Sequence, residues 1–145
     1  MPKLIDVGRA MVRGDVAPPP VATTVGFSLT SIEPGRTVFE MEVGRQHHNP
    51  MGTLHGGILC DIADAAMGMA YASRLEDGES FTTLELKINF LKPLRSGKVR
   101  AEGRVVKAGR SVGLVECDVL DGEGSLVARA SSTCMTLRGE MAQGR

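Results

Sequence analysis

Apolar and polar residues alternate along the second half of the chain, which is the pattern of β-strands with one buried face. The clearest run ends at Lys92-Pro93, and its apolar members are Leu84, Leu86, Ile88 and Phe90. Turn signals at 108–110 and 121–124 separate three further expected strands, at 98–108, 112–120 and 126–137. Connections this short favour an antiparallel meander.

The first part of the chain predicts a short helix and two strands. Residues 2–13 place apolar side chains roughly on one side of a helix, which the prolines at 18–20 stop. Strands are expected at 25–32 and 37–43, because the Pro and Gly of the intervening Glu33-Pro34-Gly35-Arg36 suit a tight turn.

Residues 56–73, between these two groups of strands, have the composition of a buried helix. Asp61 and Asp64 are the only charged residues, and most of the others are Ala, Met, Ile, Leu and Gly. A helix that is apolar nearly all round is a buried helix. Arg74 and the break at 76–78 mark its end.

The order of two strands, one long helix and four strands predicts an α+β domain in which one antiparallel sheet of about six strands wraps one central helix. We expect this domain at residues 23–140. It follows an N-terminal extension at residues 1–22, which contains the short helix. Since no second long helix covers the sheet, its outer face is either exposed to solvent or packed against another copy of the chain. A homodimer or homotetramer is therefore expected.

Composition narrows the range of partners. The 145-residue chain has 17 basic and 17 acidic residues, and with one Tyr and no Trp it lacks both the charge and the stacking residues of a nucleic-acid platform. The three cysteines form no disulfide or metal pattern, and His47 and His48 have no ligand spacing with other residues. We therefore expect no bound metal. No segment is typical of a signal peptide or membrane span, so we expect a cytoplasmic protein.

The stretch from His48 to Ala66 holds the candidate chemistry. Gly56 and Gly57 begin the long helix, where the first backbone N–H groups have no partner inside the helix and the helix dipole adds positive charge. The oxygen of a thioester carbonyl would be stabilised there as it gains negative charge. Alternatively, the glycine pair only permits a tight turn into the helix.

Asp64 is surrounded in sequence by apolar residues, and we expect it to be buried. An unpaired carboxylate in such a place costs several kcal/mol unless it is hydrogen-bonded, protonated or in a wet cleft, so the position suggests function. Asp61, one turn earlier, is either its partner or a first-turn residue favoured by the dipole. Gly56 and Asp64 are about 12 Å apart along one helix, so a pair acting on one carbonyl must come from different subunits.

The motif resembles that of the hotdog-fold thioesterases, in the branch of the phenylacetate-degradation thioesterases and their mammalian acyl-CoA relatives. It reads Asn49-Pro50-Met51-Gly52-x-x-His55-Gly56-Gly57-x-x-x-x-x-x-Asp64, and looser similarity extends from about Val25 to Leu137. The resemblance implies the hotdog fold and a site shared across a dimer. It also implies that Asp64 is the general base or nucleophile, that the Gly56 amide polarises the thioester carbonyl, and that Asn49 orients the attacking water or the leaving group. His55 would mainly organise the loop or contact the thioester.

Two further groups of residues follow from the same resemblance. A hydroxyl on the strand after the helix often assists the acid; the matching position is Thr83, where close relatives have Ser, and Thr82 is a rival. Lys107, Arg110 and Ser111 flank a turn that could meet the phosphates of CoA, although a solvated strand face explains most basic residues of this region.

The sequence thus predicts a thioester hydrolase, an acyl-CoA thioesterase with no cofactor beyond the CoA of its substrate. A hotdog enoyl-CoA hydratase or dehydratase using His55 and Asp64, and a non-catalytic acyl-CoA-binding protein, are the alternatives. The acyl group, and the choice between CoA and acyl carrier protein, are left open.

Overall fold

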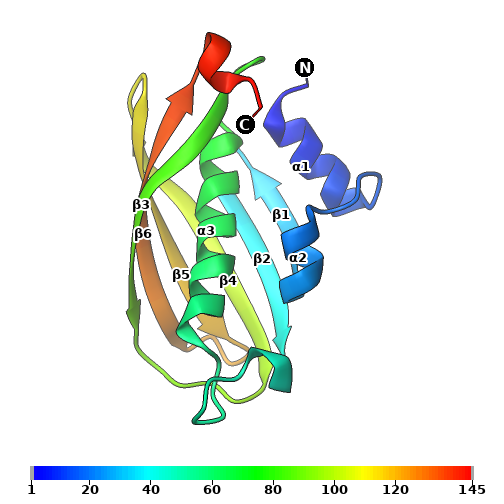
Figure 1. Cartoon of the computed structure of the whole chain (residues 1–145), viewed down its shortest axis with the longest axis vertical. Helices are drawn as coiled ribbons and strands as arrows, with labels where there is room; N and C mark the ends of the chain where they lie inside the picture. Colours follow the sequence, from blue (N-terminus) through cyan, green and yellow to red (C-terminus); the bar gives the residue numbers. More distant parts are fainter. Residues whose placement is uncertain (1, 145) are drawn as a thin grey trace.

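A six-stranded antiparallel sheet curls around one long helix in the computed structural model, which describes residues 2–144 (Figure 1). The helix is α3 (Gly56–Ala72), and it lies along the concave side of the sheet. The order of strands in the sheet is β1-β2-β4-β5-β6-β3. The strands are β1 (Phe27–Glu33), β2 (Arg36–Val43), β3 (Ser80–Phe90), β4 (Gly97–Ala108), β5 (Val112–Asp121) and β6 (Leu126–Leu137). The predicted α+β architecture is confirmed, and β4, β5 and β6 form the predicted meander.

Contacts between α3 and the sheet fix the helix in place. The Thr37 hydroxyl of β2 donates a hydrogen bond of 2.6 Å to the carbonyl oxygen of Ala66 in the middle of the helix. A side chain at Gly103 of β4 would collide with the same carbonyl, so the close approach of strand and helix requires glycine there. At the helix end, the Gly35 N–H donates to the Ser73 hydroxyl at 2.7 Å. These contacts set the depth and rotation of α3, and therefore which of its side chains face away from the sheet.

The hydrophobic core lies between α3 and the middle strands. Fully buried residues of the helix meet fully buried residues of β4, β5 and β6. Each large aliphatic side chain buried in this way stabilises the fold by roughly 1.5–3 kcal/mol. The largest are Ile62, Met67, Val99, Val115, Val119 and Val127.

The N-terminal segment contains two helices rather than the one expected. α1 (Leu4–Arg13) confirms the predicted helix, and α2 (Pro20–Val25) was not predicted. The predicted end of the first helix before the prolines is confirmed, but the expected strand start at Val25 is wrong because Pro20 begins α2, a position where its missing N–H costs nothing. Gly26, with φ of 99°, ends α2 and turns the chain into β1. The boundary drawn after residue 22 falls inside α2.

Strand β3 is longer and more exposed than expected. It begins at Ser80 rather than Leu84, and a bulge between Thr83 and Glu85 interrupts its pairing with β6. The expectation of a covered apolar face is wrong for Leu84 and Phe90, which are 54% and 55% exposed. The physical reason is that β3 is an edge strand, and within residues 2–144 no further strand pairs beyond it.

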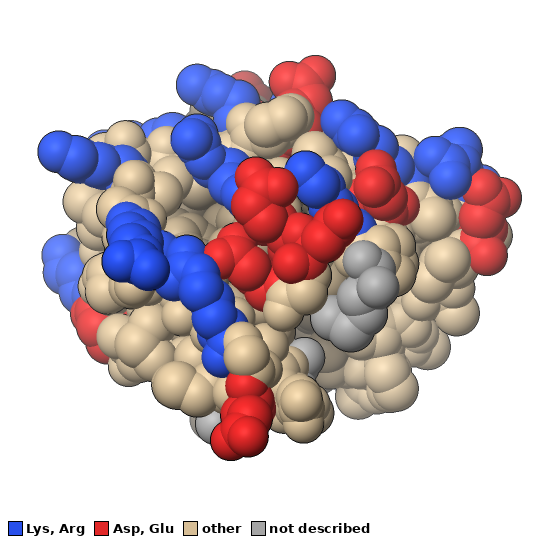
Figure 2. All heavy atoms as spheres, turned by 90° about the horizontal axis from the view of Figure 1, so that it is seen from above, with Lys and Arg blue, Asp and Glu red and all other residues tan. Residues whose placement is uncertain are grey.

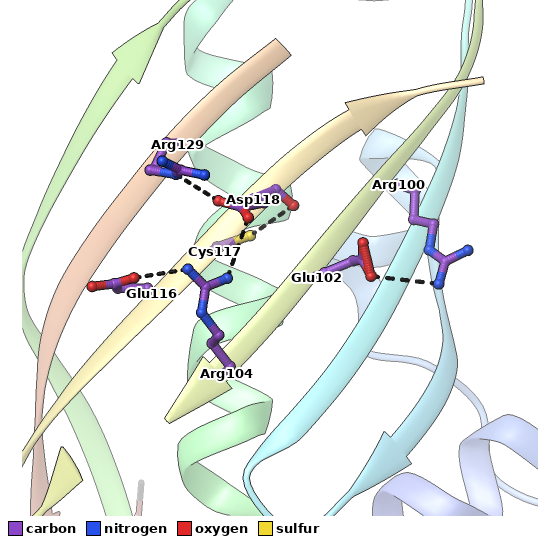
Figure 3. Close-up of polar contacts among 7 residues, drawn as sticks. All are labelled: Arg100, Glu102, Arg104, Glu116, Cys117, Asp118 and Arg129. Carbon is purple, nitrogen blue, oxygen red and sulfur yellow. Dashed lines mark hydrogen bonds and ion pairs between the residues drawn. The ribbon is translucent and has the colours of Figure 1, made fainter. Parts of the chain in front are cut away.

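The outer face of the sheet, away from α3, carries charged side chains that pair across the strands (Figure 3). Arg104 of β4 lies between Glu116 and Asp118 of β5, at 2.8 and 3.4 Å, and Asp118 also contacts Arg129 of β6 at 2.7 Å. Hydrogen bonding to Arg129, together with the positive charge of Arg104, lowers the pKa of Asp118 against the opposing effect of burial. None of the helices within residues 2–144 is long and apolar enough to cross a membrane.

Candidate active site

The loop before α3 is organised by Asn49. Its side-chain oxygen accepts from the backbone N–H groups of Met51 and Thr53 at 3.0 and 3.1 Å, and its amide nitrogen donates to the Thr53 hydroxyl at 2.9 Å. Gly52 completes the turn with φ of 77°. The Asn49 side chain therefore shapes this loop, and one of its two amide hydrogens is left for another partner.

The loop ends at His55, which caps the N-terminus of α3. The Nδ1 atom of His55 accepts a hydrogen bond of 2.8 Å from the Gly57 N–H. His55 therefore organises the start of the helix, and its Nδ1 is occupied. The Gly56 N–H has no hydrogen-bond partner among residues 2–144. Among the described residues, the N–H at this helix end that has no partner is therefore the one predicted to hold a carbonyl oxygen.

Gly56 also has a packing role. A Cβ atom at this position would lie 2.8 Å from the ring of Phe90, at the end of β3. The absence of a side chain lets the aromatic ring lie directly against the helix start. The structural and functional interpretations of the glycine are compatible, since the Gly56 N–H has no hydrogen-bond partner within residues 2–144 although Phe90 packs against this residue.

Asp64 lies two turns further along α3, on the face turned away from the sheet. The expectation that it is buried is wrong for the single chain: both Asp61 and Asp64 are exposed. The helix is rich in alanine, so its sequence is apolar on all sides, while only the side facing the sheet is covered. The argument from the cost of burial therefore does not apply within one chain.

Thr83 is the hydroxyl partner of Asp64. Its Oγ1 donates a hydrogen bond of 3.1 Å to Asp64 Oδ1, directly before the bulge in β3. Of the two threonines considered, the structure places Thr83 rather than Thr82 against the acid. Asp61 has no hydrogen bond or ion pair among residues 2–144, and so is not a partner of Asp64.

A pocket of about 460 Å³ opens beside Asp64 and Thr83. It lies over the open side of α3, between the edge strands β1 and β3, and its lining is mainly apolar. The sequence did not reveal that the N-terminal segment forms one of its walls. The wall residues are Met11, Pro18, Pro19, Val21 and Ala22.

Lys107, Arg110 and Ser111 lie at the other end of the fold from Gly56. Lys107 lies near the end of β4 and the other two lie in the turn that follows, and Gly113 just beyond this turn packs against Tyr71 near the end of α3. Figure 2 looks at this end, where Lys and Arg side chains surround a central group of Asp and Glu. Since α3 is about 25 Å long, these residues are too far away to share a compact site with Gly56 of the same chain.

The surroundings of His47, Cys60 and Cys117 indicate structural roles. Buried His47 bonds through its two ring nitrogens to the backbone of Gly44 and Val25. Burial raises the pKa of the Cys117 thiol to about 12. Burial and, secondarily, the charges of Asp61 and Asp64 raise the pKa of Cys60. Within residues 2–144, no three His, Cys, Asp or Glu side chains are grouped so that they could hold a metal ion.

Comparison with known proteins identifies the class to which this fold and site belong. Residues 51–128 match the family model of the thioesterase superfamily, so the chain belongs to that family. The hotdog architecture and the predicted enzyme class, a thioester hydrolase, are confirmed at this level.

Individual relatives place the chain within the family. It is 32% identical to a 1,4-dihydroxy-2-naphthoyl-CoA hydrolase of Listeria monocytogenes, over 68% of this chain and 80% of the relative. It is 34% identical to the proofreading thioesterase EntH of Klebsiella pneumoniae, over 76% and 77% of the two chains. A phenylacetic acid degradation-related protein from Ralstonia eutropha superposes with a TM-score of 0.80 and 33% identity, covering 88% of this chain and 98% of that one. The resemblance to the phenylacetate-degradation branch is confirmed.

Proposed function

We propose that this protein hydrolyses acyl-CoA thioesters to a free acid and CoA. The observation that carries the proposal is a carboxylate at Asp64, which has a single neutral donor and lines an apolar pocket, on the same helix whose first N–H, that of Gly56, has no hydrogen-bond partner within residues 2–144. A relative that acts on a CoA thioester, the naphthoyl-CoA hydrolase, supports the choice of substrate.

The chemistry follows from these groups. Asp64 takes a proton from a water molecule as that water attacks the thioester carbonyl, or its carboxylate attacks directly and water then cleaves the resulting anhydride. Negative charge develops on the carbonyl oxygen, where the Gly56 N–H and the helix dipole stabilise it. The C–S bond then breaks, and CoA leaves as a thiolate that takes up a proton. The Thr83 hydroxyl holds Asp64 in place.

A second copy of the chain completes the site. Gly56 and Asp64 lie about 12 Å apart along the same helix, so one carbonyl meets both only if they come from two helices. The edge strand β3 offers unpaired backbone groups and exposed apolar side chains for such pairing. We propose a homodimer, or a homotetramer built from it. In this assembly Lys107, Arg110 and Ser111 would contact the CoA phosphates of a site whose Gly56 and Asp64 come from other subunits.

The hydratase alternative is less well supported by the geometry, because His55 Nδ1 already accepts from Gly57. Loss of the conjugated chromophore of an enoyl-CoA, measured with the same protein, would establish that alternative. A non-catalytic acyl-CoA-binding protein would bind these ligands and release no thiol.

The test of the proposal is thiol release from a series of short, long and aryl acyl-CoAs, with Asp64→Asn as the comparison. Loss of the base lowers kcat by about 10²-fold or more. Because Asp64 is exposed, the midpoint of thermal unfolding should stay unchanged, which shows that the fold is intact. Near-normal turnover by the variant would refute the role of Asp64, and no turnover by the natural protein on any acyl-CoA would refute the function.

A further inference from the structure

The pocket beside Asp64 has one wall that is formed by the N-terminal segment. Its wall residues come from α1, α2 and the linker between them, all of which precede the matched residues 51–128. The rest of the pocket belongs to α3, the edge strands β1 and β3, and Phe39 of β2. The N-terminal segment thus forms part of the surface next to the candidate chemistry.

We propose, on the basis of the function proposed above, that this pocket holds the acyl group and that the N-terminal wall selects neutral, apolar acyl groups over acyl groups that end in a carboxylate. The position of the pocket supports the first part. Asp64 and Thr83 line it together with the apolar residues, so a thioester carbonyl that reaches Asp64 directs its acyl chain along the same cavity.

The charges of the pocket support the selectivity. Among the described residues that line it, none is Lys, Arg or His, and the two ionisable side chains are the carboxylates of Asp61 and Asp64. A second carboxylate at the far end of an acyl chain would lose water against apolar side chains without gaining a cation. It would also be repelled by the two aspartates. A methyl group at the same place loses no hydration.

The wall is held firmly enough to discriminate. Pro18 and Pro19 restrict the backbone of the linker, since each ring fixes its own φ. α1 is anchored at Gly8, where an added Cβ would come within 2.6 Å of the Ile32 side chain and 3.3 Å of the Met69 side chain. The wall therefore keeps its place against the open side of α3 when a ligand enters.

Val21 and Val16 provide a matched pair for the test. Both are valines of the N-terminal segment, they are 53% and 41% exposed, and only Val21 lines the pocket. Val21→Arg places a cation at the wall, whereas Val16→Arg adds the same charge to the same segment away from the pocket. Both side chains have room for arginine without disturbing the core.

The measurement is the ratio of kcat/KM for hexanoyl-CoA to that for adipoyl-CoA, which have equal chain length and differ by the terminal carboxylate. The natural protein should favour hexanoyl-CoA by about 100-fold or more, the scale on which a site rejects a group it leaves unpaired. Val21→Arg should reduce this ratio by about 10-fold, and Val16→Arg should change it less than twofold. Equal turnover of both substrates by the natural protein, or equal effects of the two variants, would overturn the inference.

Binding of two uncleavable thioethers, S-hexyl-CoA and S-(5-carboxypentyl)-CoA, separates this inference from the proposed hydrolysis. Calorimetry should give the same preference and the same effect of Val21→Arg. If no acyl-CoA is hydrolysed but this binding pattern is found, the pocket inference holds and the proposed function fails. If hydrolysis is found without the pattern in turnover or binding, only the pocket inference fails.

Discussion

Charged side chains occupy two surfaces of this protein. The two surfaces differ in how many hydrogen-bond and ion-pair partners these side chains have. On the outer face of the sheet, Arg104 contacts two carboxylates and Asp118 contacts two arginines (Figure 3). On the open side of α3, Asp64 has one neutral donor and Asp61 has no hydrogen bond or ion pair among residues 2–144. Both surfaces carry carboxylates, but within residues 2–144 only those of the first surface are paired with cations.

The difference indicates what each surface does. Groups that find their partners within one chain hold strands in register, and a ligand would have to displace those partners to bind there. Groups that lack hydrogen-bond or ion-pair partners, such as the Gly56 N–H and most of the Asp64 carboxylate, can bind a substrate or a second subunit without displacing existing partners. Variants of the two surfaces should therefore affect different measurements.

The largest effect is expected at Gly56. Gly56→Pro removes the N–H at the first helical position, where proline fits, and His55 already has the extended backbone (φ −65°, ψ 137°) that proline requires of its predecessor. Gly56→Ala keeps the N–H and brings a Cβ atom against the same Phe90 ring. We expect kcat of the proline variant to be about 10²–10³-fold below that of the alanine variant. Equal kcat values would show that the N–H does not stabilise the oxyanion.

A mixture of subunits sharpens this result. Asp64→Asn and Gly56→Pro chains, mixed equally so that their subunits exchange, should recover about a quarter of the natural activity, since half of the dimers are mixed and each has one intact site. No recovery would place Gly56 and Asp64 in sites formed by one chain, against the proposed dimer.

A smaller effect is expected at Thr83. Thr83→Val removes the hydroxyl bonded to Asp64 and should lower kcat about 10-fold, the scale of one hydrogen bond to a charged group. Thr133 offers a control, because its hydroxyl donates to Glu85 at the same distance of 3.1 Å. Thr133→Val should leave kcat within twofold. Similar losses from both variants would mean that the effect is general to the strands.

On the outer face we expect a change in stability without a change in kcat. Asp118→Asn should reduce the free energy of unfolding at pH 7 by about 0.5–1 kcal/mol, as for partly exposed ion pairs. Because its pKa is lowered in the folded state, Asp118 stabilises the protein above its unfolded pKa, and this contribution is lost as the pH falls through the folded pKa. Denaturant unfolding at pH 7 and pH 3 should show a smaller difference at the lower pH.

The smallest effect concerns the thiol of Cys60. Since the charge of Asp61 helps to raise the pKa of Cys60, Asp61→Asn should speed its alkylation at pH 8 by about two- to fivefold. Asp64→Asn should have a smaller effect, because its charge contributes less. Cys117, whose pKa is about 12 and which is fully buried, should stay unmodified in the folded protein. Unchanged alkylation in both variants would mean that other charges balance the aspartates of this face.

Local patterns predicted the long helix, the first short helix and all six strands. The alternation that ends at Phe90 identified β3, and the Pro and Gly before Arg36 identified the turn between β1 and β2. The same local approach missed α2, because three consecutive prolines indicate a break equally well whether or not the third begins a new helix. It also placed the start of β3 at Leu84, since the bulge interrupts the period of two.

The amino-acid sequence by itself determined the inventory of this protein: one apolar helix, strands with one apolar face, and a loop-to-helix motif with Gly56 and Asp64. These features depend on the spacing of neighbours along the chain. Only the tertiary structure decided that Asp64 is exposed, that Thr83 is its partner, and that the N-terminal segment forms a wall of the pocket. Each of these depends on how the sheet curls and on the depth at which α3 is seated through Thr37 and Gly103, which are contacts between residues far apart in the chain.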